Sequence, residues 1–188
     1  MGTGCLVAVT GANACGKSTL LFAISGIIPE YLQATITGTI SLNELDLLGI
    51  QLREMYHHLS FAMTDSEAQL MFPDIMSEIA FALENMGLPI DQIQHRVKSA
   101  TQRFGIHHML ERSPKTLSGG EQRLVLFACL DALNSPLVLL DEPETGLSDK
   151  NIMVLCDWLS ELKDKGRIVL IATHCRTLID LCDHIVEL

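Results

Sequence analysis

Short apolar runs alternate along the chain with longer stretches in which apolar residues recur at three- and four-residue spacing. The short runs predict strands at 5–11, 58–63, 137–142, 167–173 and 184–188. The longer stretches predict helices at 17–28, 73–87, 89–105, 118–134 and 150–166. Repeated alternation of strand and helix indicates an α/β fold, with a mostly parallel sheet flanked by helices on both faces.

Two regions depart from this alternation. Residues 35–42 alternate Thr with Ile around a central Gly, which favours an antiparallel edge strand or hairpin. The helical block near 66–119 contains no strand, so we expect an inserted α-helical subdomain on one side of the core. The sequence thus predicts one domain over 1–188, with its core at about 1–65 and 120–188.

Charge and hydropathy narrow the class of partner and the location. The net charge is −10, and the 13 Lys and Arg residues are scattered. Because binding to a phosphate backbone depends on clustered cations, we expect no nucleic-acid partner. Charge or Pro interrupts every apolar stretch before the ~20 residues that a membrane span needs. No basic segment precedes the first apolar run, so a cytoplasmic location is expected.

The segment GANACGKS at 11–18 has every fixed position of G-x-x-x-x-G-K-[ST], and it lies between a predicted strand and a predicted helix. Gly11 and Gly16 let backbone N–H groups converge on phosphate oxygens at the start of the helix. Lys17 is suited to the β- and γ-phosphates, and the Ser18 hydroxyl to Mg²⁺. The alternative is a structural turn, which does not require the Lys-Ser pair. The predicted nucleotide-binding set also includes Asn13 and Thr19.

The apolar run LVLLDE at 137–142 ends in two carboxylates. Four apolar residues bury the strand, so Asp141 emerges at its carboxyl end, where ligands of open α/β sheets bind. Asp141 is therefore predicted to hold Mg²⁺ through its water shell. Glu142 is predicted to orient or deprotonate the attacking water, which makes it a catalytic candidate.

The segment LSGGE at 117–121 resembles the signature of ABC ATPases, because QRLVLFA follows it and the LVLLDEP strand lies shortly beyond. Ser118, Gly119 and Gly120 offer a hydroxyl and backbone N–H groups at a helix N-terminus. The resemblance implies ATP hydrolysis in a head-to-tail homodimer or heterodimer of ATPase subunits, with the signature acting in trans. His174, after the RIVLIAT strand, matches the switch histidine of that family and is the second catalytic candidate.

The segments SGIIPEYLQATITGTISLNELDLLG and QLMFPDIMSEIAFALENMGLP resemble the ATPases of energy-coupling-factor importers. This resemblance implies ATP and Mg²⁺ as cofactors and an integral membrane coupling protein as partner. It places the chain at the inner face of the cell membrane, where it would power import of a metal ion or a vitamin.

The sequence departs from the family pattern at three places. No aromatic residue precedes Gly11, so the N-terminal antiparallel segment and its adenine-stacking contact are largely missing from these residues. Thr64 stands where a glutamine is expected, with Gln69 five residues further on, and Ser148 replaces an aspartate. These positions concern coupling between sites. They keep two alternatives open: a degenerate ATP-binding regulatory subunit, and an ABC ATPase without a transport role.

Overall fold

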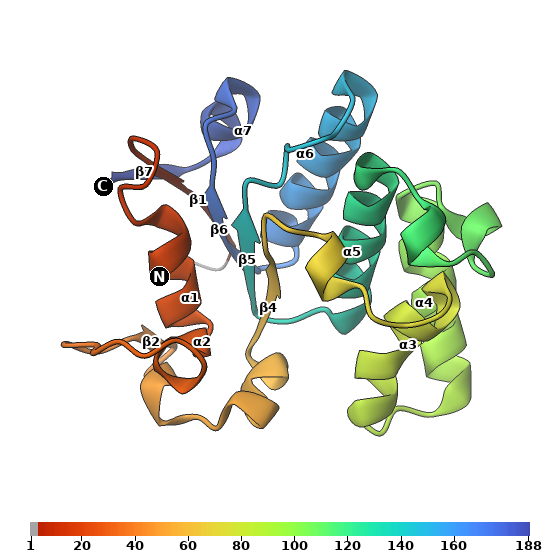
Figure 1. Ribbon diagram of the computed structural model, residues 1–188, viewed down its shortest axis with the longest axis horizontal. Coiled ribbons are helices and arrows are strands. Elements are labelled where there is room, and N and C mark those ends of the chain that lie inside the picture. The colour runs from red at the N-terminus through yellow and green to blue at the C-terminus, as the bar shows by residue number, and fades with distance from the viewer. Residues whose placement is uncertain (1–3) are drawn as a thin grey trace. The chain divides into compact units, whose positions relative to one another are not determined.

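The computed structural model describes residues 4–188 and contains a five-stranded sheet in the order β4-β5-β6-β1-β7 (Figure 1). Hydrogen bonding is parallel between β1 and β6, between β1 and β7, and between β5 and β6. The strands are β1 (Cys5–Thr10), β4 (Leu59–Ala62), β5 (Leu137–Asp141), β6 (Ile168–Ala172) and β7 (His184–Glu187). The predicted α/β fold with a mostly parallel sheet is confirmed.

The strand register brings three strand ends to one edge of the sheet. Asp141 at the end of β5 and Val9 near the end of β1 both pair with Ala172, the last residue of β6. Since parallel strands share their direction, the segments that follow β1, β5 and β6 leave the sheet at the same edge. This edge carries the phosphate loop, Asp141 with Glu142, and His174.

The chain forms two compact units, of which the first holds the sheet and spans residues up to 61, 135–143 and 158–188. Its helices are α1 (Lys17–Ile24), α2 (Ile27–Glu30) and α7 (Arg176–Leu181), with 3-10 turns at Leu47–Gly49 and Leu52–His57. The buried cluster of this unit consists of Val9, Leu21, Leu47, Met55, Leu59, Leu137, Leu139 and Ala172. Sheet residues pack there against the inner face of α1 and the segment 47–59.

Two predictions in this unit need correction. The helix expected over 17–28 ends at Ile24, because Gly26 takes a left-handed φ of 80° that no helix continues through. The strand expected over 35–42 is reduced to β2 (Ser41–Leu42), which pairs antiparallel with β3 (Leu45–Asp46). Positive φ angles at Asn43 and Glu44 form the tight turn between them, so a short hairpin replaces the longer strand.

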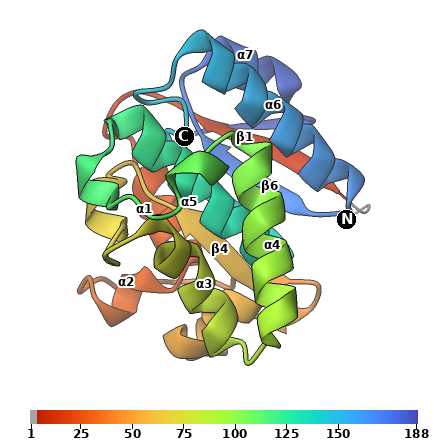
Figure 2. The ribbon, with the colours of Figure 1, turned by 90° about the vertical axis from the view of Figure 1, so that its right-hand side faces the viewer.

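The second unit spans residues 62–134 and 144–157 and is built around α3 (Ile75–Asn85), α4 (Ile90–Arg103) and α5 (Gly119–Leu133). Both α3 and α4 pack against α5 (Figures 1 and 2). The rings of Phe104 and Phe127 lie 5.9 Å apart, and Arg103 pairs with Asp131 at 3.2 Å. Short 3-10 turns occur at Glu67–Gln69, His107–Met109 and Pro114–Thr116, and α6 (Asp149–Asp164) begins in this unit.

The helix α5 belongs to this second unit, whereas the prediction assigns residues from 120 onward to the core. Its buried residues include Gln122 and Arg123 as well as a continuous apolar run from Leu124 to Ala128. A helix buried on most sides has no single apolar stripe, so its pattern does not indicate which neighbour it packs against.

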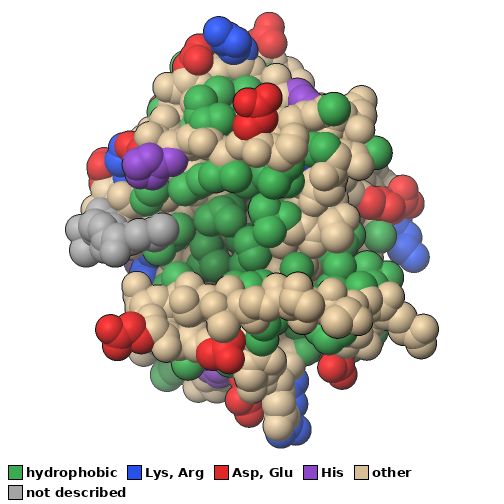
Figure 3. All heavy atoms as spheres, turned by 90° about the vertical axis from the view of Figure 1, so that its left-hand side faces the viewer, with side chains coloured by type: hydrophobic (Ala, Val, Ile, Leu, Met, Phe, Trp, Pro, Cys, Tyr) green, Lys and Arg blue, Asp and Glu red, His purple; other side chains and the backbone are tan. Residues whose placement is uncertain are grey.

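One face of the first unit gathers apolar side chains in a hollow (Figure 3), which lies on the side of Figure 1 where β7 is drawn. The edge strand β7 is exposed throughout, with Ile185 at 59% and Val186 at 43% exposure. Exposed apolar residues on an edge strand form a surface suited to contact with another element. Within residues 4–188, no helix combines the length and apolarity needed to cross a membrane.

Candidate nucleotide-binding site

The loop between β1 and α1 requires glycine at two positions. Gly16 is the N-cap residue of α1 and has a φ of 109°, while Gly11 has a φ of 143°. A Cβ on Gly11 would lie 2.6 Å from the carbonyl oxygen of Leu188 and 2.7 Å from the Cys15 Sγ. Gly11 is thus needed for both conformation and space, and Gly16 for conformation alone.

The side chain of Lys17 binds backbone carbonyl groups of this loop. Its side chain is buried, at 6% exposure, and its Nζ donates to the carbonyl oxygens of Gly11 at 3.2 Å and Ala12 at 3.0 Å. The first N–H groups of α1 have no partner within their own helix and face the loop side. A compact cation and a helix N-terminus together form an anion site.

A cavity of about 380 Å³ lies at this loop, and it also includes Glu142. Five of the six predicted nucleotide-binding residues line it, together with Ala14; they are Asn13, Gly16, Lys17, Ser18 and Thr19. The parallel register explains why Glu142, which is far away in sequence, reaches the loop. A carboxylate that can face water is therefore placed beside a phosphate-binding loop.

The two carboxylates after β5 occupy different environments. Asp141 is 2% exposed, whereas Glu142 is half-buried and takes a left-handed φ of 46°. The Glu142 N–H donates to the Ala172 carbonyl oxygen at 2.8 Å, which fixes this kink. The kink directs the chain out of the sheet directly after Asp141, so Asp141 is buried while its neighbour Glu142 is partly exposed.

The residues present fit Mg²⁺. The Asp141 carboxylate and the Ser18 hydroxyl are oxygen ligands, which Mg²⁺ prefers. Across residues 4–188, no group of three or more His, Cys, Asp or Glu side chains is arranged to hold a metal. Mg²⁺ usually takes only one or two protein ligands beside phosphate and water, so this donor set is compatible with an ion bound together with a nucleotide.

His174 follows β6 at the same sheet edge, two residues beyond Ala172. Its side chain is exposed and is not among the residues that line the cavity. Next to it, the Thr173 hydroxyl accepts a hydrogen bond from the Cys175 N–H at 2.9 Å, which shapes the turn into α7. The strand end therefore positions the backbone of His174 while its side chain stays accessible.

The signature residues begin α5 in the second unit. Ser118 is the N-cap residue, and Glu121 completes a capping box by accepting from the Ser118 N–H and hydroxyl, both at 2.8 Å. The bond from the Ser118 N–H, followed by that from its hydroxyl, lowers the pKa of Glu121. A Cβ on Gly120 would lie 2.7 Å from the Gly146 carbonyl oxygen, whereas one on Gly119 would meet no atom within 4 Å.

The three uncertain coupling positions, Thr64, Gln69 and Ser148, take part in local hydrogen bonds. The Gln69 Oε1 accepts from the Met63 N–H at 2.7 Å, and the Ser148 Oγ accepts from the Asn151 N–H at 3.4 Å as α6 begins. The carbonyl oxygen of Thr64 accepts from the Arg123 Nη2 at 2.6 Å. Arg123 is not among the predicted site residues, although a lone Arg beside the apolar run of α5 is a signal that could have indicated it.

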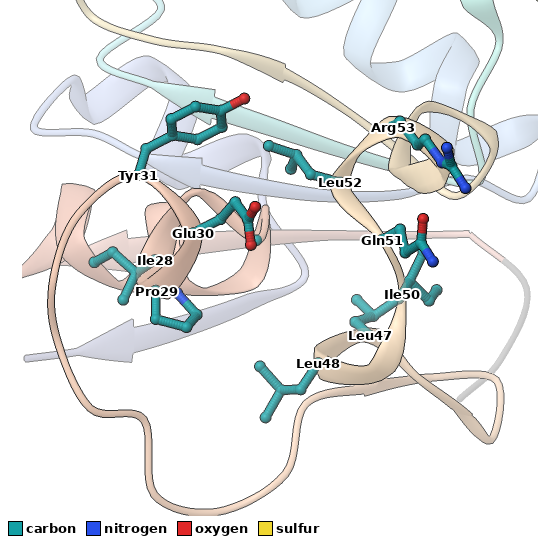
Figure 4. A pocket seen from close by; sticks show the side chains of 11 residues that line it. Ile28, Pro29, Glu30, Tyr31, Leu47, Leu48, Ile50, Gln51, Leu52 and Arg53 are labelled. Atoms are coloured by element: carbon teal, nitrogen blue, oxygen red, sulfur yellow. The ribbon is translucent and has the colours of Figure 1, made fainter.

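A second cavity, of about 450 Å³, lies between α2 and the segment 47–53 (Figure 4). Figure 4 shows Ile28, Pro29 and Tyr31 on one wall, with Leu47, Leu48 and Ile50 on the other. Its lining combines aliphatic side chains with Glu30, Gln51 and Arg53, and no predicted site residue belongs to it. Of these two cavities, the one at the phosphate loop contains the predicted nucleotide-binding residues together with Glu142.

Comparison with known proteins identifies the family. Residues 1–145 match the family model described as ABC transporter. A protein of Geobacter sulfurreducens named as an ABC transporter ATP-binding protein is 32% identical over 186 residues, which cover 97% of this chain and 70% of that protein. A similarly named protein of Treponema denticola is 31% identical over 97% of this chain, and the match covers 38% of its own length.

Solved structures show the same fold. The cbiO1 structure from Clostridium perfringens, described as part of the ABC transporter complex cbiONQ, has a TM-score of 0.82 at 26% identity and covers 98% of this chain and 73% of its own. The dimeric cassette MJ0796 has a TM-score of 0.86 at 19% identity, with 99% and 82% covered. This chain spans 33–38% of the length of the Treponema and Methanosarcina relatives. The chain belongs to the ABC transporter family of ATP-binding domains.

Proposed function

We propose that the chain binds ATP with Mg²⁺ and hydrolyses it. The observation that carries this proposal is the cavity in which the phosphate loop, with its buried Lys17, shares its lining with Glu142. Lys17 and the N-terminus of α1 bind and neutralise phosphate oxygens, while Ser18 and Asp141 hold Mg²⁺. Mg²⁺, when bound, neutralises charge on the phosphates. Glu142 orients the attacking water and accepts its proton, and His174 assists from the end of β6.

We further propose that hydrolysis takes place in a head-to-tail dimer and powers transport. Ser118 and Gly119 present a hydroxyl and open backbone at the start of α5, which suits contact with a nucleotide held by a second ATPase subunit, identical or different. The partner is an integral membrane coupling protein, and the transported solute is a metal ion or a vitamin. The likeness to cbiO1 supports this class of transporter. In this arrangement the chain lies at the cytoplasmic face of the membrane.

The Glu142→Gln variant tests this function. Gln keeps the size of the side chain and removes the base, so the affinity for ATP is expected to stay nearly unchanged while turnover falls by about 10²–10⁴. Calorimetry measures binding, and phosphate release measures turnover, in the chain alone and with its membrane partner. Glu44→Gln, which removes the same charge from the exposed β2–β3 turn, is the matched control and should keep full turnover.

One observation favours a second candidate, a regulatory subunit that binds ATP and hydrolyses little. The side chains of Gln69 and Ser148 accept hydrogen bonds from nearby backbone N–H groups, those of Met63 and Asn151. The same experiment separates the candidates. If wild type and Glu142→Gln turn over equally slowly in the assembled complex while both bind ATP, the regulatory function replaces the hydrolytic one.

A further inference from the structure

Arg123 is a buried cation within the helix that begins at the signature. Its exposure is 2%, and it lies five residues beyond Ser118 on α5. The Nη1 donates to the Met63 carbonyl oxygen at 2.7 Å, and the Nη2 donates to the Thr64 carbonyl oxygen at 2.6 Å. One guanidinium therefore binds two successive carbonyls of the loop that follows β4. Bonds from a charged donor are roughly twice as strong as neutral ones.

The same loop is held from its other side. The Gln69 Oε1 accepts from the Met63 N–H at 2.7 Å, and the Asp65 carboxylate accepts from the Ala68 N–H at 3.2 Å. Met63 is thus bound at both its N–H and its carbonyl oxygen, and residues 63–69 form a closed loop with few ways to rearrange internally. We therefore expect this loop to move as one body, so that any displacement of it is transmitted to Arg123.

The helix α5 joins Arg123 to the signature. Five residues of α-helix span about 7.5 Å along the axis and behave as a rigid rod over that length. The start of the rod is fixed by the capping box of Ser118 and Glu121 and by the close approach of Gly120 to Gly146. Any change in the position of loop 63–69 is therefore passed to the N–H groups at the start of α5.

We propose that Arg123 is a positioning residue that sets the orientation of the signature N-terminus according to the position of loop 63–69. This inference rests on the proposed function, in which Ser118 and Gly119 contact the nucleotide of a second subunit. Because Arg123 is only 2% exposed, we expect it to touch neither the nucleotide nor a partner. It acts through α5, and its loss is expected to weaken signature docking without affecting the phosphate loop.

The test is made on the full chain in the Glu142→Gln background, which traps bound ATP. Monomer affinity for ATP is measured by calorimetry at low protein concentration, and ATP-dependent dimerisation by sedimentation velocity. Arg123→Met should leave ATP affinity within about threefold and weaken dimerisation at least about tenfold. Arg123→Lys should dimerise more weakly than the background and more strongly than Arg123→Met, because a lysine ammonium lacks the planar fork that reaches both carbonyl oxygens.

Arg96→Met is the matched control. Arg96 is half-buried in the same unit, and its Nη1 donates to the Ala132 carbonyl oxygen at 3.1 Å near the other end of α5. This variant removes a comparable bond far from the signature, so its dimerisation should equal that of the background. Gln69→Leu, which releases the Met63 N–H, should weaken dimerisation in the same direction as Arg123→Met.

Three results would overturn the inference. If Arg123→Met dimerises like the background, the proposed role of Arg123 is refuted and the proposed function is left intact. If Arg96→Met weakens dimerisation as much as Arg123→Met does, Arg123 only stabilises the helical unit in general and has no specific positioning role. A background that fails to dimerise at millimolar ATP, both alone and with a second ATPase subunit added, overturns the proposed dimer and this inference with it. If Arg123→Met unfolds at the assay temperature, Arg123→Lys and Gln69→Leu decide, and unchanged dimerisation in both is the refuting result.

Discussion

Two adjacent glycines of the signature are predicted to respond in opposite ways to the same methyl group. A Cβ on Gly120 would lie 2.7 Å from the backbone oxygen of Gly146, while a Cβ on Gly119 would meet nothing within 4 Å. Both residues belong to the first turn of α5 and neither has a positive φ, so backbone strain does not distinguish them. The difference between the two variants is therefore steric.

The size of the effect follows from the missing space. Ordinary van der Waals contact begins at 3.4 Å, so Gly120→Ala reaches it only if the distance to the Gly146 oxygen increases by about 0.7 Å from 2.7 Å. Overpacking against backbone typically costs about 1–3 kcal/mol. For a chain of this size, that corresponds to a fall in Tm of roughly 2–12 °C. Gly119→Ala should instead raise the free energy of unfolding by about 0.4–1 kcal/mol, because Ala reduces the conformational entropy of the unfolded chain.

Urea and thermal denaturation of the two variants beside wild type measure this difference. A second measurement, ATP-dependent dimerisation in the Glu142→Gln background, should show that Gly119→Ala weakens docking although it is the more stable variant. The open space beside Gly119 is where the proposed function places the nucleotide of the second subunit. Equal stability of the two variants, or a Gly120→Ala protein as stable as wild type, would refute the steric reasoning.

Two further predictions concern Glu121 and Gly16. The hydrogen bonds from Ser118 lower the pKa of Glu121, so its contribution to stability is present above the unfolded value of about 4.3 and is lost as the pH falls through the lower folded value. The difference in urea midpoint between wild type and Glu121→Gln should therefore shrink from pH 7 to pH 3, and a constant difference would contradict the cap. Gly16→Ala should lower the free energy of unfolding, measured by denaturation, by at least about 1 kcal/mol. The cause is the φ of 109° alone, because a Cβ at this position would meet no atom within 4 Å. Unchanged stability would count against this loop geometry.

Much of the fold could be predicted because its signals are local. Strand β5 has four apolar residues followed by Asp141, and the structure buries all five of its residues. The phosphate loop has Gly16, whose left-handed backbone favours glycine, directly followed by Lys17 at the first position of α1. Both features can be recognised from adjacent residues in the sequence. Since strand, loop and helix follow one another directly, their relative placement needs no knowledge of distant contacts.

The errors share a different cause, which is long-range packing. The hairpin near 41–46 is shorter than the Thr-Ile alternation indicates, because the turn at Asn43 and Glu44 pairs only two residues on each side. The membership of α5 depends on its contacts with α3 and α4, which a helix buried on most sides does not reveal in its own pattern. The bonds of Arg123 join positions about 60 residues apart and leave no periodic signal.

These backbone contacts bear on how far the two substituted positions alter the protein. The helix α5 binds the loop of Thr64 at a carbonyl oxygen, and at Gly120 it leaves no space for a Cβ beside the Gly146 carbonyl oxygen in the loop before Ser148. Contacts to main-chain atoms do not depend on which side chain the residue carries. Thr in place of Gln at 64, and Ser in place of Asp at 148, therefore leave the support of the signature unchanged and alter only what the two loops present to other molecules. On this reasoning we expect nucleotide-driven dimerisation to survive both substitutions, while stimulation of turnover by the membrane partner changes.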